Sequence, residues 1–64
     1  MRFNLKELRL KRGLSQIALA EKSGVERVTI NRMENGKLEQ TTSGTLVKLA
    51  DALETTIDSL IVKE

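Results

Sequence analysis

The stretch GVERVTINRMENG, residues 24–36, holds four side chains whose types and spacing suit contacts with the edges of bases. At about 100° per residue, the apolar residues of this stretch share one side of a helix, and these are Val25, Ile30 and Met33. The other side carries the four side chains, Arg27, Val28, Asn31 and Arg32. Arginine can donate two hydrogen bonds to guanine O6 and N7, and valine offers a methyl surface to the thymine methyl group. Burial does not explain these outward residues, so they are free to bind a partner, although exposed arginines are more often solubilising charges alone.

The composition excludes most catalytic and metal chemistry. The chain has no Cys and no His, and its carboxylates are scattered, so it offers neither a zinc site nor a nucleophile paired with a base. We therefore predict that the protein is not an enzyme and that it uses no cofactor, no metal and no small-molecule substrate. The N-terminal residues MRFNLKELRLKRG carry charges in every turn, which is typical neither of a signal peptide nor of a membrane span. We expect a cytoplasmic protein without membrane contact.

Length and charge distribution narrow the class of partner. A chain of 64 residues is expected to form a single domain, and folding at that size buries only about 60% of the unfolded surface. Residues 1–37 hold nine basic and four acidic side chains, whereas residues 38–64 hold two basic and five acidic ones. The basic half could face a polyanion. The alternative is an uneven but ordinary set of solvated helix faces.

The apolar spacing of three or four residues, without proline or a low-complexity linker, predicts an all-α fold. A first helix is expected over about 5–12, a second from Ser15 as N-cap through Lys22, and a third over about 26–34. Thr42 is expected to cap a fourth helix and Thr56 a short fifth one. The apolar residues of these helices that should face the core are Leu19, Ala20, Leu46, Leu49, Ala50, Leu53, Ile57, Leu60 and Ile61.

The start of the first helix carries two further local signals. Asn4 followed by Glu7 matches a capping box, in which each side chain binds the backbone N–H of the other residue. Phe3, which precedes the cap, is placed to pack on Leu8. Both signals predict a helix that begins directly after Asn4.

The second helix, a turn containing Gly24 and the third helix have the spacing of a helix-turn-helix unit over about 15–35. The stretch GLSQIALAEKSGVERVTINRMENGK resembles the helix-turn-helix of the Cro and lambda-repressor type, the Xre family. The shared pattern is Gly-Leu-Ser/Thr-Gln, then Leu-Ala, Gly-Val, Ile and Glu-Asn-Gly at fixed offsets. The later TLVKLADALETTIDSLI resembles the two closing helices of that family. The resemblance therefore covers nearly all of residues 1–64 and implies a compact five-helix, lambda-repressor-like DNA-binding domain.

The resemblance also implies roles for individual residues. The third helix matches the family's recognition helix, which enters the major groove of DNA. Positions that contact bases in the family match Arg27, Val28 and Arg32, and these are bordered by Glu26 and Asn31. The residues implied to contact phosphate are Ser15, Gln16, Asn35 and Lys37. Gln16 also matches a position that braces the first reading residue, although it could be an ordinary surface glutamine. Asn35 before Gly36 is equally well explained as a helix stop.

Arg9 and Glu34 match a pair that the family buries as a salt bridge between the first helix and the end of the third. Here the residues and the resemblance agree on an architectural role.

Glu26 departs from the family, which commonly has Ser or Thr as the N-cap of the third helix. Its carboxylate could accept a hydrogen bond from a cytosine N4 amino group.

Three further departures concern contacts around the helix-turn-helix. The connection LEQTT after Lys37 adds no cation and is one residue longer than a common family length. Binding to the phosphate backbone is therefore expected to be modest. Gly44 weakens the start of the fourth helix by about 1 kcal/mol relative to alanine. Leu10 and Ile17 stand where the family often has charged residues. Isolated exposed apolar residues are normal, and a partner surface is the alternative.

These features predict sequence-specific binding of double-stranded DNA by a transcription regulator, a repressor that occludes a promoter. One domain covers a half-site, so a homodimer on a pseudo-palindromic operator is expected. Its self-contact would be IDSLIVKE, in which Ile61 or Val62 could meet the second copy. The alternative from another class is a protein-interaction module, coactivator-like or antitoxin-like, that keeps the fold without reading DNA. A third alternative is a sequence evolved or designed in the laboratory on this scaffold.

Overall fold

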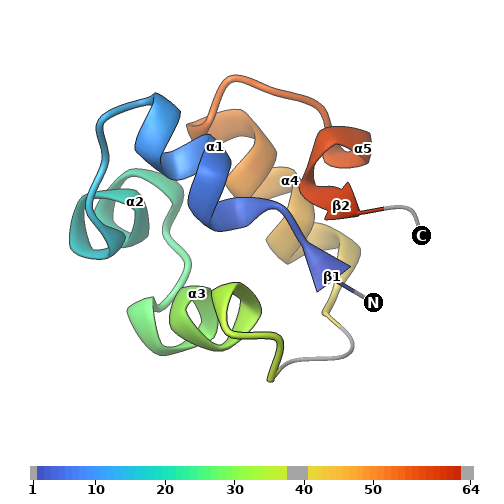
Figure 1. Cartoon of the computed structure of the whole chain (residues 1–64). Coiled ribbons are helices and arrows are strands. Elements are labelled where there is room, and N and C mark those ends of the chain that lie inside the picture. The colour runs from blue at the N-terminus through green and yellow to red at the C-terminus, as the bar shows by residue number, and fades with distance from the viewer. Residues whose placement is uncertain (1, 38–40, 63–64) are drawn as a thin grey trace.

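Five short helices and a two-stranded sheet make up the computed structural model of the chain, which describes residues 2–37 and 41–62 (Figure 1). In chain order the elements are β1 (Arg2–Phe3), α1 (Leu5–Lys11), α2 (Gln16–Ser23), α3 (Arg27–Glu34), α4 (Ser43–Ala52), α5 (Ile57–Leu60) and β2 (Ile61–Val62). The five predicted helices are confirmed, with ends close to those expected. Most of the LEQTT connection and the end of IDSLIVKE lie outside the described residues. Within residues 2–37 and 41–62, no helix is long and apolar enough to cross a membrane.

The helix starts follow from three side-chain caps that were predicted and are confirmed. Ser15, Thr42 and Thr56 have extended backbones. Each accepts, through its side-chain oxygen, a hydrogen bond from the backbone N–H three residues later, at 3.0, 3.2 and 3.2 Å respectively. The caps bind N–H groups that have no acceptor within the helix. The starts of α2, α4 and α5 are therefore fixed by local interactions.

The core receives side chains from every helix. Its largest fully buried residues are Leu5, Leu19, Ile30, Met33, Leu49, Leu53 and Leu60. The remaining predicted inward residues are buried or partly buried against this cluster. α2 packs against both α3 and α4, and α1 also packs against α3. In Figure 1, α3 consequently lies at the lower edge of the bundle, where one side is packed and the other faces outward.

The two ends of the described chain are joined by an antiparallel sheet that the sequence does not predict. Arg2 pairs with Val62, and Phe3 pairs with Ile61. Strands of two residues are too short to show the alternating pattern by which a strand is recognised. The sheet brings both ends to the same side of the molecule, as Figure 1 shows.

The predicted capping box at Asn4 is wrong, and the sheet explains why. The side chain of Asn4 makes no cap hydrogen bond, and its backbone, with φ −93° and ψ 42°, is not in the extended conformation of a typical N-cap. Its backbone N–H donates to the carbonyl oxygen of Leu60 at 2.8 Å. Because that N–H is already bound, it is not available to the carboxylate of Glu7.

Arg12 links the end of α1 to the end of α4. Its Nε donates to the backbone oxygen of Leu53 at 3.0 Å, and its Nη2 donates to that of Glu54 at 3.3 Å. Its Nη1 also lies 3.4 Å from Oε2 of Glu54 in an exposed ion pair. Glu54 has a φ of +53°, in the left-handed region that costs a residue with a Cβ about 1–2 kcal/mol. The guanidinium thus supports a strained turn between α4 and α5.

Candidate nucleic-acid interface

The turn between α2 and α3 fixes how α3 leaves the bundle. Gly24 ends α2 with a φ of +77°, and its N–H donates to the carbonyl oxygen of Ala20 at 2.9 Å. A side chain at this position would be strained by the backbone conformation. Val25 follows with its N–H bound to Oγ of Ser23 at 3.1 Å and its side chain buried in the core. The chain therefore enters α3 from a turn that is fixed by the backbone and anchored by packing.

The outward side of α3 carries the four side chains that periodicity places there. Arg27, Val28, Asn31 and Arg32 are all exposed. Val28 is 56% exposed, and at about 100° per residue it lies between Asn31 and Arg32 around the helix. Ile30, on the opposite side, is fully buried. α3 thus presents two guanidinium groups, one amide and one branched apolar side chain on a single convex surface.

The start of α3 breaks two rules of helix stability. Glu26, the N-cap, is exposed and makes no side-chain cap hydrogen bond. Arg27 places a positive charge on the first helical residue, beside the positive end of the helix dipole, where a cation is unfavourable. Local choices that disagree with stability are expected mainly at functional sites. A binding partner therefore explains these two residues better than the stability of the helix does.

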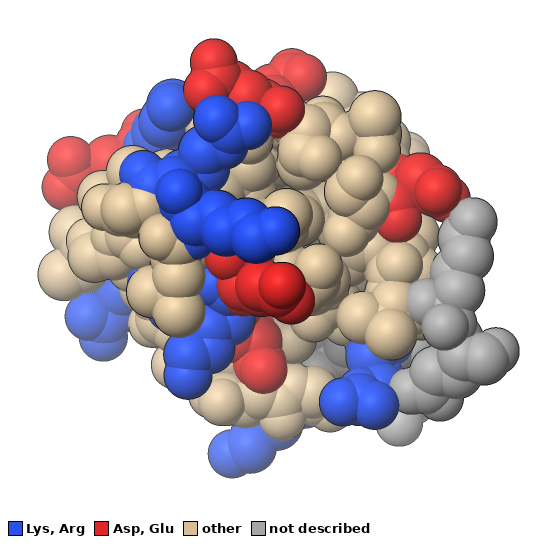
Figure 2. Space-filling model, turned by 45° about the horizontal axis from the view of Figure 1, so that its top comes forward, with Lys and Arg blue, Asp and Glu red and all other residues tan. Residues whose placement is uncertain are grey.

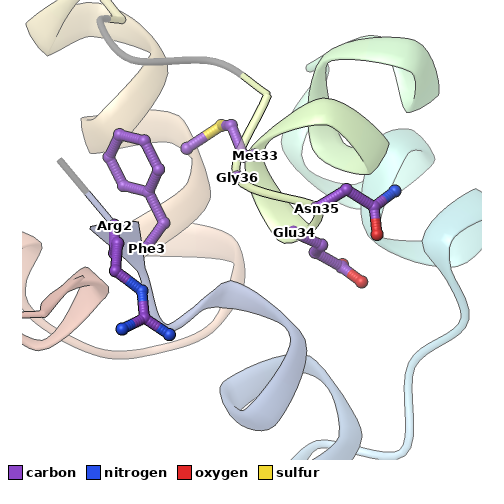
Figure 3. Close-up of a pocket in the computed structure, with 6 residues that line it drawn as sticks. All are labelled: Arg2, Phe3, Met33, Glu34, Asn35 and Gly36. Carbon is purple, nitrogen blue, oxygen red and sulfur yellow. The ribbon is translucent and has the colours of Figure 1, made fainter.

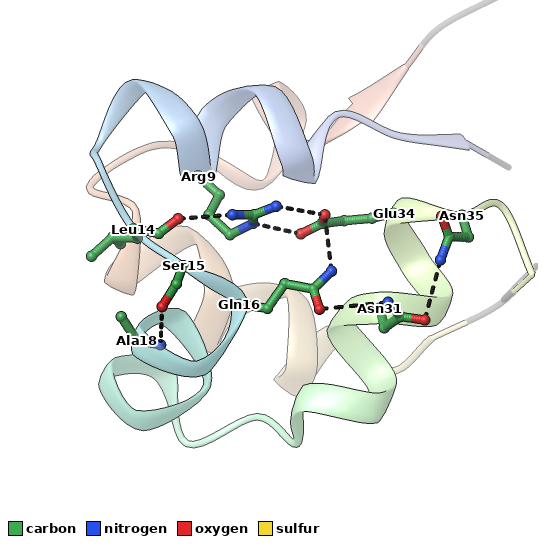
Figure 4. A network of polar contacts seen from close by, with 8 residues as sticks. All are labelled: Arg9, Leu14, Ser15, Gln16, Ala18, Asn31, Glu34 and Asn35. Carbon is green, nitrogen blue, oxygen red and sulfur yellow. Dashed lines mark hydrogen bonds and ion pairs between the residues drawn. The ribbon is translucent and has the colours of Figure 1, made fainter.

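A buried ion pair holds the other end of α3 against α1 (Figure 4). Nε and Nη2 of Arg9 donate to Oε2 and Oε1 of Glu34 at 2.8 and 2.9 Å, and Nη1 donates to the backbone oxygen of Leu14 at 2.8 Å. The side chain of Glu34 is only 3% exposed. The hydrogen bond to Glu34 raises the pKa of Arg9 above its ordinary value, so the guanidinium remains charged. The pair joins the two helices and also satisfies a carbonyl of the loop before α2.

The ion pair continues into a chain of amides that reaches the outward side of α3. Nε2 of Gln16 donates to Oε1 of Glu34 at 3.2 Å. Nδ2 of Asn31 donates to Oε1 of Gln16 at 3.5 Å, and Nδ2 of Asn35 donates to Oδ1 of Asn31 at 3.1 Å. Figure 4 shows the side chains in this order, from the buried pair to the surface. Gln16 therefore links the buried ion pair to Asn31 on α3.

The four residues implied to contact phosphate flank this surface at two places. Ser15 and Gln16 lie at the start of α2, where backbone N–H groups and the helix dipole favour an anion. The Ser15 hydroxyl already caps the helix, so it keeps only part of its hydrogen-bonding capacity. Asn35 and Lys37 follow α3, and both are exposed. The backbone N–H of Lys37 donates to the carbonyl oxygen of Arg32 at 2.9 Å, which holds this cation beside the end of α3.

Exposed cations outnumber exposed carboxylates around α3, whereas the side of the molecule seen in Figure 2 carries both signs of charge. That view brings the top of Figure 1 forward, and acidic and basic side chains lie next to one another on it. Between residues 26 and 37 the exposed cations are Arg27, Arg32 and Lys37, whereas Glu26 is the exposed carboxylate and Glu34 is neutralised by its ion pair. The segment around α3 is therefore the more suitable face for a polyanion.

A pocket of about 260 Å³ lies between β1 and the end of α3 (Figure 3). It is lined by Arg2, Phe3, Met33, Glu34, Asn35 and Gly36. In Figure 3, Phe3 and Met33 point toward one another, whereas Glu34 and Asn35 point away toward the polar chain of Figure 4. In the described part of the chain, no group of His, Cys, Asp and Glu side chains could hold a metal ion. Within the described residues the pocket therefore offers no metal site, and Phe3 and Met33 form its apolar side.

Two packed helices joined by a tight turn, with one side of the second helix exposed, define a helix-turn-helix domain. The family comparison gives the same class, because residues 5–60 match the family HTH_3, helix-turn-helix. The chain belongs to this family, as its resemblance to Xre-type proteins predicted.

Two solved structures resemble most of this fold. The restriction-modification controller protein C.AhdI from Aeromonas hydrophila is 37% identical, with a TM-score of 0.81 over 89% of this chain and 85% of that one. An HTH_3 family transcriptional regulator from Vibrio cholerae is 38% identical, with a TM-score of 0.77 over 86% of this chain. The match spans only 30% of that regulator. A comparison with curated proteins gave no match.

Proposed function

We propose that the protein binds a specific sequence of double-stranded DNA by placing α3 in the major groove, and that it acts as a repressor by covering a promoter. Membership of the HTH_3 family supports a DNA-binding transcription regulator. The main support for placing α3 in the major groove is its outward side, which is exposed while the opposite side is buried. The exposed residues are Arg27, Val28, Asn31 and Arg32. A helix with such a surface fits the width of the major groove.

The proposed contacts divide into those that read bases and those that hold phosphates. Arg27 and Arg32 would each donate two hydrogen bonds to a guanine, and Val28 would contact a thymine methyl group. Glu26 would accept from a cytosine amino group at the start of α3. The phosphate contacts would come from Ser15, Gln16, Asn35 and Lys37, which border this surface on both sides. Phosphate contacts fix the register of the helix, and base contacts provide the specificity.

Two copies are proposed to bind a pseudo-palindromic operator. The Cα atoms span 27 × 21 × 20 Å, so two domains fit side by side on half-sites about 34 Å apart. Val62 in β2 is 38% exposed and remains available to a second copy, whereas Ile61 packs partly against the core. Sedimentation with a palindromic duplex should reach saturation at two chains per duplex. Saturation at one chain would contradict the proposal.

Selection of bound duplexes from a random pool, at stated salt, tests the main proposal. Enrichment of one motif, bound more weakly when its bases are scrambled, would support sequence-specific binding. Equal binding of all duplexes would contradict it. The salt concentration must be held fixed because phosphate contacts alone make affinity strongly dependent on salt.

A protein-interaction module is the second candidate, and two side chains favour it. Leu10 on α1 and Ile17 on α2 are 57% and 53% exposed, as the sequence predicted. A partner that buries them would lose affinity with Leu10→Ser or Ile17→Ser, whereas DNA binding would be unchanged. The second candidate takes precedence if no motif is enriched and a purified partner responds to these variants.

A further inference from the structure

The buried carboxylate of Glu34 and the surface amide of Asn31 are connected by the side chain of Gln16 (Figure 4). We propose that this connection fixes which way the Asn31 amide points, and that Asn31 consequently selects an adenine. The inference rests on the proposed binding of α3 to the major groove. It assigns Gln16 and Glu34 as positioning residues for base recognition, in addition to any contact with phosphate.

The direction of the first amide follows from the chemistry of its partner. An ionised carboxylate only accepts hydrogen bonds, so the group of Gln16 that faces Oε1 of Glu34 must be its NH₂. The reverse orientation would place two oxygens together at a side chain that is 3% exposed. The ion pair with Arg9 holds this carboxylate in place. The carbonyl oxygen of Gln16 is therefore directed away from Glu34.

The direction of the second amide follows from the first. The oxygen of Gln16 lies 3.5 Å from Nδ2 of Asn31, and an oxygen at this point favours the NH₂ side of that amide. On its other side, Oδ1 of Asn31 accepts from Nδ2 of Asn35 at 3.1 Å. The oxygen of Gln16 therefore sets the orientation of Asn31, and the amide of Asn35, which can turn either way, takes the orientation that donates to Oδ1. Asn31 is held with its nitrogen toward α2 and its oxygen toward the end of α3.

An amide held in this way keeps one N–H and one oxygen lone pair for a ligand. Adenine presents one acceptor, N7, and one donor, the N6 amino group, on its major-groove edge. Guanine presents two acceptors there, thymine presents an acceptor and a methyl group, and cytosine presents a donor. Adenine satisfies both free groups of Asn31. An amide that could rotate freely would instead offer its donor or its acceptor to any of the four bases.

Relative affinities for single-base-pair variants of the selected duplex test the proposal, each measured at one salt concentration. Asn31→Ala first identifies the base pair that depends on Asn31. We expect an A·T pair, and a preference for it that falls roughly 5- to 150-fold. Gln16→Ala should lower the preference at this same pair roughly 2- to 10-fold, as expected for one lost hydrogen bond. The double variant should show no further loss beyond that of Asn31→Ala, because Gln16 acts through Asn31.

Ratios between duplexes separate positioning from other roles. Any phosphate contact of Gln16 affects all duplexes alike, so it cancels in the ratio. Lys37→Ala is the matched control, and it should weaken binding without changing preference at any base pair. Gln16→Ala retains the Arg9–Glu34 pair, so the variant should remain folded, which thermal unfolding checks.

Three other results would each refute a different claim: the positioning role of Gln16, the selection of adenine by Asn31, or the proposed function. If a motif is selected but Gln16→Ala leaves every ratio unchanged, the positioning role is refuted while the proposed function stands. If Asn31→Ala relaxes a pair other than A·T, or none, the assignment of adenine is refuted. Failure to select any motif would overturn the proposed function itself.

Discussion

Replacing Arg9 with alanine should destabilise the free domain by about 3–5 kcal/mol, because it leaves the carboxylate of Glu34 buried without its counter-ion. The structure shows what is lost. Two hydrogen bonds to Glu34, at 2.8 and 2.9 Å, disappear together with a third to the backbone oxygen of Leu14. Gln16 retains its single hydrogen bond to the carboxylate and offsets only part of the loss.

This loss is large for so small a domain. At about 0.05–0.15 kcal/mol per residue, a chain of 64 residues has a free energy of unfolding of roughly 3–10 kcal/mol. Arg9→Ala should therefore remove a third or more of the stability and could unfold the domain outright. The raised pKa of Arg9 means that its contribution is complete below its ordinary pKa and is lost progressively as the pH rises from there through the raised value. The deficit of the variant should consequently be constant across neutral and mildly alkaline pH.

Urea unfolding followed by circular dichroism measures the effect without DNA. With a slope of about 1 kcal/mol per molar urea, the midpoint should fall by several molar. Lys11→Ala, on the exposed side of the same helix, is the matched control and should change stability by less than about 0.5 kcal/mol. Equal midpoints for Arg9→Ala and the unmodified chain would refute the reasoning, since they would mean that the pair is not buried.

Two further predictions concern reading and backbone strain. Arg27→Ala or Arg32→Ala should cost about 1–3 kcal/mol on the selected duplex and relax one base pair, whereas Lys37→Ala should weaken all duplexes alike and reduce the salt slope by about one. The affinity ratio between the selected and a scrambled duplex distinguishes them, and α3 is not the reader if both arginine variants keep the ratio. Glu54→Gly should raise the urea midpoint by relieving about 1 kcal/mol of strain at φ +53°. Glu54→Ala removes the same exposed ion pair without relieving strain, so equal midpoints for the two variants would argue against the strain.

The parts of the fold that sequence predicts are those set by neighbours along the chain. Ser15, Thr42 and Thr56 were predicted as caps because each binds an N–H only three residues away. Asn4 carries the same kind of signal, yet its N–H is bound by Leu60, from the far end of the chain. No local pattern contains that contact. The two-residue strands were missed for the same reason, since their pairing has no period to detect.

In the candidate site, too, sequence predicts what depends on local periodicity and misses what depends on contacts between distant residues. Periodicity alone places Arg27, Val28 and Arg32 on the outward side of α3, and the structure agrees because the apolar residues between them must be buried. Sequence did not predict that Gln16 would be bound between Glu34 and Asn31. That contact depends on the packing of α1, α2 and α3 around one carboxylate, whose third hydrogen-bond donor comes from 18 residues away. A glutamine and an asparagine on neighbouring helices are too common to indicate such a link.

Glu34 therefore serves two purposes that a double variant can separate. Arg9→Met with Glu34→Met replaces the buried pair by apolar side chains, an exchange that is often neutral or stabilising, so the domain should remain folded where Arg9→Ala fails. The exchange also removes the acceptor that directs the NH₂ of Gln16. If the carboxylate matters only for stability, the double variant should keep the base preferences of the unmodified chain. If it also directs Gln16, preference should relax at the base pair affected by Asn31→Ala and stay intact at pairs read by Arg27 and Arg32. A stable double variant with unchanged preferences would confine Glu34 to architecture.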